Sequence, residues 1–147
     1  MMKYRRLTTD ELDGLKQEFV HYLAQQGIPA EDWARRLVTN EGVEEHLDGF
    51  SEYFFDRATA AITFLERQDG DTTWLFSFGE REASLIRLQV DNHGQGQIAG
   101  TGQKTFEPEA RGREIFLLLE QGAQPSKGEK FEAAQATLNQ SGSENPR

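Results

Sequence analysis

The sequence predicts an α+β fold: two or three N-terminal helices packed on a three- to four-stranded antiparallel meander, with a C-terminal helix completing the layer. Apolar residues recur at helical spacing as far as about residue 58 and alternate with polar residues from residue 62 to residue 90. An unbroken apolar run then follows at residues 115–119. Helices followed by a run of short strands are typical of this fold class.

The first helix is expected to begin at Thr8. Thr8 and Glu11 have the spacing of a capping box, in which each side chain accepts a hydrogen bond from the backbone N–H of the other residue. An apolar stripe follows, and Gly27 supplies the left-handed residue that ends many helices. Gly14 weakens a helix by about 1 kcal/mol relative to alanine but lies off the stripe, so one helix is expected as far as Gly27.

Two further helices are expected after this one. Pro29 fits the first turn of a helix over residues 30–38. Asn40 is a candidate N-cap for a long third helix that runs to about Ala58. Phe50 and Phe54 lie on the apolar stripe of this third helix.

The period then changes from helical to alternating. Three strands are expected, over residues 62–67, 72–78 and 84–90. Asp69-Gly70 is a hairpin signal between the first two. Trp74, Phe76 and Phe78 share one face of the second strand, so one face of the meander is expected to be buried.

The remainder of the chain is less regular. Residues 91–102 hold four glycines and predict a loop, which leads into a fourth strand near residues 103–106. A helix is expected between Pro108 and Gly122, and a short buried strand is the alternative for its apolar run at residues 115–119. We therefore expect a single α+β domain over residues 1–122. Residues 123–147 are expected to form a weakly structured extension with at most one weak helix, and a disordered tail from residue 141.

Charge and composition exclude several classes of function. The chain has 25 acidic and 16 basic residues, a net charge of -9, which disfavours nucleic acid and anionic membranes as partners. It has no cysteine, so disulfides, thiolate metal sites and cysteine nucleophiles are excluded. No segment approaches the about 20 apolar residues of a membrane span, and no signal peptide is recognisable, so the cytoplasm is the expected location.

No motif predicts a catalytic residue, a cofactor-binding residue or a metal ligand. The glycines between residues 94 and 102 do not have the spacing of a dinucleotide-binding or phosphate-binding loop, and a flexible hairpin loop is the preferred interpretation. The three histidines, His21, His46 and His93, lie in no metal-binding pattern. We therefore expect no cofactor and favour a protein that is not an enzyme.

Aromatic residues are the more informative feature. Those of the third helix occupy more than one face, so a second face must pack on another element, line a pocket or bind a partner. The leading interpretation is a cytoplasmic protein-interaction module that binds an unknown protein or itself as a homodimer. The candidate interaction surface consists of Tyr4, Arg5, Arg6, Tyr53 and Phe55.

Two alternatives stay open. The first is a small-molecule-binding protein or small enzyme, with a pocket between helices and sheet formed by His46, Tyr53, Trp74 and Phe76. The second is an acidic partner of a basic protein, comparable to an immunity or chaperone protein, for which the net charge is the only support.

The opening of the chain also carries a resemblance. Residues 3–33, which begin KYRRLT and continue through GIPAEDW, resemble the start of an uncharacterised family of small cytoplasmic bacterial proteins. A weaker likeness extends through EIFLLLEQGA at residues 114–123. The resemblance implies a shared fold and no site residues, because the family has no assigned activity.

Overall fold

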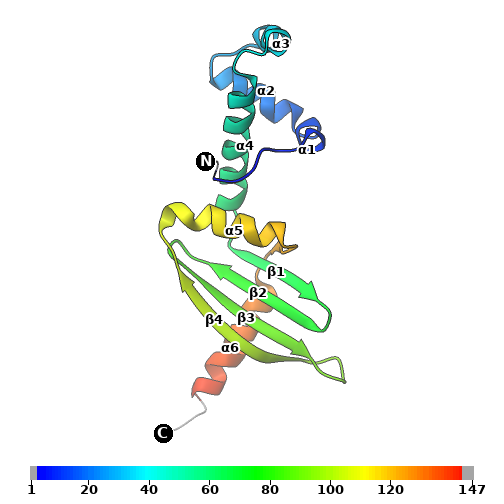
Figure 1. Cartoon of the computed structure of the whole chain (residues 1–147). Helices are drawn as coiled ribbons and strands as arrows, with labels where there is room; N and C mark the ends of the chain where they lie inside the picture. The colour runs from blue at the N-terminus through cyan, green and yellow to red at the C-terminus, as the bar shows by residue number, and fades with distance from the viewer. Residues whose placement is uncertain (1–2, 144–147) are drawn as a thin grey trace. The chain divides into compact units, whose positions relative to one another are not determined.

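The computed structural model describes residues 3–143, and it confirms the α+β class, with N-terminal helices, then an antiparallel sheet, then C-terminal helices (Figure 1). Internal contacts divide the chain into two compact units, Met1–Ala58 and Thr59–Arg147. The boundary between these units falls near the end of a long helix. We describe the helical unit and the sheet unit separately.

The helical unit holds α1 (Thr9–Asp13), α2 (Lys16–Gln25), α3 (Ala30–Thr39) and most of α4 (Val43–Ala60). The predicted capping box is confirmed, because the Glu11 N–H donates to Thr8 Oγ1 over 3.2 Å and the Thr8 N–H donates to Glu11 Oε1 over 2.8 Å. The single helix expected as far as Gly27 was wrong. The first helix ends at Gly14. The Leu15 N–H donates to the Leu12 carbonyl, three residues back, instead of to the carbonyl four residues back that would continue an α-helix.

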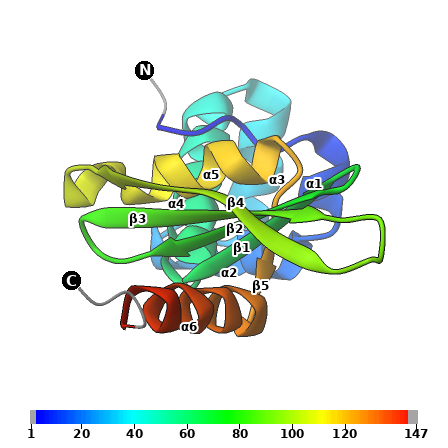
Figure 2. The same cartoon turned by 90° about the horizontal axis from the view of Figure 1, so that it is seen from below.

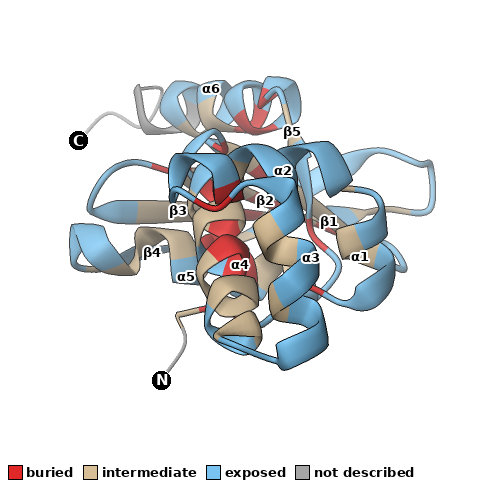
Figure 3. Cartoon of the chain, turned by 90° about the horizontal axis from the view of Figure 1, so that it is seen from above, coloured by how far each residue is buried: buried red, intermediate tan, exposed pale blue. Residues whose placement is uncertain are grey.

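Asn40 does not cap the start of the third helix as expected. It ends α3 in the left-handed conformation, with φ of 58°, which asparagine adopts more readily than most residues. α4 begins three residues later, and a stripe of buried residues runs along it (Figure 3). Phe50 is 1% exposed, and its ring lies 4.9 Å from that of Phe19 and 5.4 Å from that of Tyr22. Of the four aromatic residues of α4, Phe50 and Phe55 are therefore buried in this unit, whereas Tyr53 and Phe54 are half-buried.

The sheet unit holds five strands in the order β4-β3-β2-β1-β5, with antiparallel neighbours. Their bounds are β1 Phe64–Asp69, β2 Thr72–Phe78, β3 Glu82–Val90, β4 Gly96–Thr105 and β5 Gln124–Ser126. The meander is confirmed. β5 was not predicted, because its three residues include Pro125 and are too few for alternation to be visible; proline is tolerated on such an edge strand.

Both faces of the sheet are covered, whereas one buried face was expected. After a short 3-10 turn at Pro108–Ala110, helix α5 (Arg111–Glu120) packs Ile115 on the face that holds Leu65 and Phe78. Helix α6 (Glu129–Ser143) packs Phe131 on the opposite face (Figure 2). We call these the α5 face and the α6 face.

The described residues after 122 are more ordered than the sequence suggested. β5 pairs with β1, and α6 buries Phe131 and Ala134 to 7% exposure against Leu75 and Ile86. Phe131, Ala134 and Leu138 are the residues of α6 that pack on the sheet, and the weak apolar period of this segment did not reveal them. Residues 141–143 continue α6, and the rest of the tail expected from residue 141 lies outside the described residues.

Candidate functional site

The most accessible hydrogen-bonding edge of the sheet unit is β4, the outermost strand of the order given above (Figure 1). It is ten residues long, and within residues 3–143 no strand pairs with its outer side. The Phe106 N–H donates to the Arg81 carbonyl over 2.9 Å. Because only every second residue of an antiparallel strand bonds a given neighbour, the N–H and C=O groups of Thr101, Gln103 and Thr105 face away from β3.

Two glycines leave a gap on the α5 face of this edge. Gly100 pairs with Arg87 of β3, and Gly102 pairs with Leu85. A Cβ atom at Gly102 would lie 3.9 Å from Leu85 Cδ2, and one at Gly100 would lie 3.3 Å from Arg87 Nη2. The side chains of β3 are therefore reachable across β4. The flexible loop expected over residues 91–102 was wrong for residues 96–102, because glycines in a strand remove the alternation that identifies it.

An apolar groove lies over this gap. It has a volume of about 410 Å³ and runs between α5 and the β3–β4 side of the sheet. Its apolar walls are Phe76, Leu85, Leu117 and Leu118. Leu117 is 42% exposed, and it adds apolar surface to the groove.

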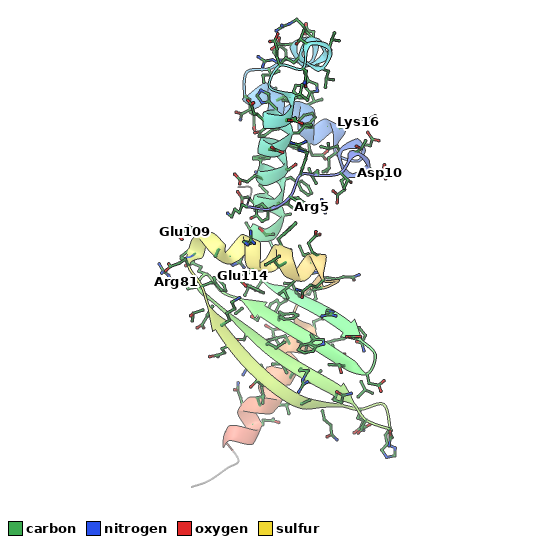
Figure 4. The ribbon with its side chains drawn as sticks, in the orientation of Figure 1. Arg5, Asp10, Lys16, Arg81, Glu109 and Glu114 are labelled. Carbon is green, nitrogen blue, oxygen red and sulfur yellow. The ribbon has the colours of Figure 1, made fainter. Side chains whose placement is uncertain are left out.

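One ion pair spans β4 and α5 at this groove. Lys104 Nζ lies 2.6 Å from Glu114 Oε1, and both residues line the groove. Glu114 comes from the part of α5 that lies beside the β4 end of the sheet (Figure 4). The charge of Lys104 is therefore neutralised within the chain.

The α6 face of the same edge is also hollowed. One groove of about 390 Å³ is lined by Ile86, Thr101, Gln135 and Leu138 among others. A second, about 750 Å³, is lined by Gly96, Ile98, Lys130 and Thr137 among others. A strand added beside β4 would alternate its side chains between the α5 groove and these more polar α6 grooves.

On the α5 face, one register row of the sheet holds three side chains that can donate hydrogen bonds and ends at a glycine of β4. Arg67, Trp74, Arg87 and Gly100 occupy one register row of β1, β2, β3 and β4. The Arg87 guanidinium lies 5.7 Å from the centre of the Trp74 ring and donates to the Ala99 carbonyl over 3.2 Å. Trp74 Nε1 is buried without a hydrogen-bond partner among the described residues. Arginine and tryptophan side chains only donate, so the row lacks acceptors.

The chain was then compared with known proteins. Residues 2–99 match a family described as a family of unknown function (DUF6495). The chain belongs to this family. No curated protein and no solved structure matches it significantly.

The DUF6495 match covers the helical unit, β1 to β3 and the first residues of β4. Gly100, Gly102 and all of α5 lie outside it, as do residues 114–123, where the sequence also suggested a likeness. The resemblance at residues 3–33 lies within the matched segment. The family therefore shows no activity for the β4 edge, which has to be interpreted from its geometry.

The basic segment before α1 binds the acidic face of its own unit. The Tyr4 hydroxyl donates to Asp56 Oδ1 over 2.6 Å, and Arg6 Nε lies 2.6 Å from Asp48 Oδ1. Arg5, labelled in Figure 4, donates to both carboxylate oxygens of Glu11, over 2.8 and 3.0 Å. These bonds, with one from the Thr8 N–H, lower the pKa of Glu11 to about 2.

The remaining predicted surface and pocket residues are divided between the units. Phe55 is 8% exposed and packs beside Tyr4, with ring centres 5.5 Å apart. Tyr53 is half-buried, with its ring under the Arg57 guanidinium at 5.4 Å. His46 lies in the same helical unit, whereas Trp74 and Phe76 lie in the sheet unit. Phe76 lines the α5 groove, and Trp74 occupies the adjacent position on the same face of β2.

No group of three or more histidine, aspartate or glutamate side chains within the described residues is placed to hold a metal ion. Over the same part of the chain, no helix combines the length and apolar character needed to cross a bilayer.

Proposed function

We propose that this protein is a non-enzymatic interaction module that binds an extended segment of a partner protein by adding it as a strand to β4. The observation that carries the proposal is the ten-residue edge strand with a groove on each face. In strand addition the main-chain hydrogen bonds supply affinity, and the pockets that accept alternate side chains supply specificity.

The composition of β4 supports this function. Soluble proteins blunt long edge strands with charges, with proline, with a β-bulge or with a covering element. β4 contains no proline and one charged residue, Lys104, whose charge is neutralised by Glu114. A bulge interrupts its pairing with β3 between Arg87 and Leu88, but Thr101, Gln103 and Thr105 lie on the regular part of the strand, so this part of the edge remains open to a partner strand.

The test is selection from a display library of random 12-residue peptides on the immobilised protein, followed by binding to two variants. Gln103→Pro removes one outward N–H from β4, a change that an edge strand tolerates, and Gln103→Ala is the matched control that keeps the amide. We expect selected peptides to bind the wild type and Gln103→Ala equally and to lose most of their affinity for Gln103→Pro. Equal binding to all three proteins, with circular dichroism confirming that each is folded, would contradict strand addition.

The α5 groove also favours a second candidate, a small apolar ligand, because its walls are mainly aliphatic and aromatic. Such a ligand would bind Gln103→Pro and wild type alike. A homodimer formed through β4 would instead show a doubled mass by light scattering that Gln103→Pro abolishes. Action in the bacterial cytoplasm belongs to the same proposal and is supported by the resemblance at residues 3–33.

A further inference from the structure

We infer that the partner segment carries a bulky apolar side chain and an acidic side chain two residues apart, both directed toward the α5 face of β4. This inference rests on the proposed strand addition and specifies which segment that edge selects. Its basis is the pair of glycines at positions 100 and 102, which expose two different side chains of β3.

The apolar half follows from Gly102. Leu85 pairs with Gly102, and no side chain of β4 covers Leu85 there. The groove above it is walled by Phe76 and Leu117 as well. A leucine, methionine or phenylalanine of an added strand, placed beside Gly102, would cover this surface and the exposed part of Leu117.

The acidic half follows from Gly100. Arg87 pairs with Gly100, and its guanidinium reaches across it to the Ala99 carbonyl, which places a positive charge at the outer strand. Within residues 3–143, no carboxylate lies within ion-pairing distance of Arg87. A carboxylate on the added strand can accept hydrogen bonds from this guanidinium, and arginine binds carboxylates with two parallel bonds when the geometry permits.

The spacing follows from the register. Alternate residues of a strand share one face and lie about 6.6 Å apart. Positions beside Gly102 and Gly100 therefore belong to residues i and i+2 of the partner segment. Lys104, two positions after Gly102 on β4, already forms an ion pair with Glu114. The acidic residue of the partner segment is therefore expected beside Gly100 and Arg87, and not beside Lys104.

A second copy of this chain fits the site less well. β4 consists of glycine, threonine, glutamine and lysine, with Ile98 and Ala99 as its two apolar side chains. A second β4 strand, parallel or antiparallel, would therefore place mainly glycine or polar residues over Leu85. None of the residues around the glycines could fill the apolar groove and neutralise Arg87 at the same time. A heterologous segment with both side chains meets both needs.

The test uses synthetic ten-residue peptides of serine and threonine with leucine at the fifth position and glutamate at the seventh, and the same pair in reverse order, because the strand direction is open. Controls replace glutamate by glutamine, or move it next to the leucine so that it faces the other side. Affinity is measured by fluorescence anisotropy, and amide chemical shifts of Thr101 and Gln103 report whether the peptide lies on β4.

We expect the leucine and glutamate peptide of one order to bind about tenfold more tightly than either control, the effect of a hydrogen bond to a charged group. Replacing glutamate by lysine should abolish this gain, and Arg87→Glu should restore it for the lysine peptide. Shifted β4 amides with equal affinity for all peptides would overturn the motif but leave strand addition intact. No binding and no shift for any peptide would overturn both.

Discussion

Arg111 is predicted to contribute more to the stability of the sheet unit than any other single polar side chain. Its guanidinium donates to four main-chain carbonyls: Ile62 at 2.7 Å, Gly79 at 2.9 Å, Thr59 at 3.2 Å and Phe78 at 3.3 Å. It thereby joins the last turn of α4 to the start of β1 and the end of β2. Only a planar fork with several donors can reach four acceptors at once.

Replacement of Arg111 by alanine should lower the free energy of unfolding of the sheet unit by about 3 kcal/mol. Hydrogen bonds to a charged group contribute about 1.5 to 3 kcal/mol each, and we count the two shortest because bonds from one side chain do not add fully. Arg111→Lys keeps the charge but not the fork, so a loss of about half that size is expected.

The two tryptophans allow each unit to be followed separately, because Trp33 lies in the helical unit and Trp74 in the sheet unit. Urea unfolding read by Trp74 fluorescence in a Trp33→Phe background measures the effect on the sheet unit. Arg81→Ala is the control, since Arg81 is exposed at the neighbouring end of the sheet (Figure 4) and its loss should cost at most about 0.5 kcal/mol. If Arg111→Ala and Arg81→Ala unfold at the same urea concentration, the reasoning is refuted.

Three further predictions concern the site, the N-terminal segment and a tight turn. Gly102→Ala should raise stability by about 0.5 kcal/mol and weaken binding of a selected peptide, because its Cβ meets only ordinary contacts; unchanged affinity by anisotropy would contradict the groove's role. The pKa of Glu11 is lowered from 4.5 to about 2, so the stability that Arg5 contributes there is present above pH 4.5 and lost as pH falls toward 2. A carboxyl carbon of Glu11 that titrates near 4.5 by NMR would refute it. Gly128→Ala should destabilise the sheet unit by about 2 kcal/mol or more, because φ is +86° and the Cβ would lie 2.4 Å from Phe64 Cδ2; urea unfolding at the wild-type midpoint would contradict this.

Features specified by neighbouring residues could be predicted from the sequence. The capping box at Thr8 and the alternation of Thr72–Phe78 are local signals, and both are confirmed. Gly14 and Asn40 were misinterpreted because each residue type is compatible with more than one place in or beside a helix; here both end a helix. The glycines of β4 concealed a strand because a residue without a side chain carries no hydropathy period.

The candidate site could not be predicted from the sequence, because it depends on register. Counted from the turn between β3 and β4, Leu88 pairs with Ile98, Ala99 is left unpaired at a bulge, and Arg87 therefore pairs with Gly100 and not with Ala99. The interaction surface expected around Tyr4 and Phe55 followed from residue type alone. Tyr4 and Phe55 are buried in the helical unit, whereas Arg6 is exposed and Arg5 and Tyr53 are half-buried, so that surface stays a prediction.

The central claim is that β4 accepts an extended segment as a further strand. Amide hydrogen exchange of Thr101, Gln103 and Thr105, with and without a peptide selected on the protein, tests it most directly. These amides face away from β3 and should exchange rapidly in the free protein, then become protected by at least about tenfold when the peptide is bound. Peptide binding that leaves their exchange unchanged, or protects only residues of the helical unit, would contradict the account.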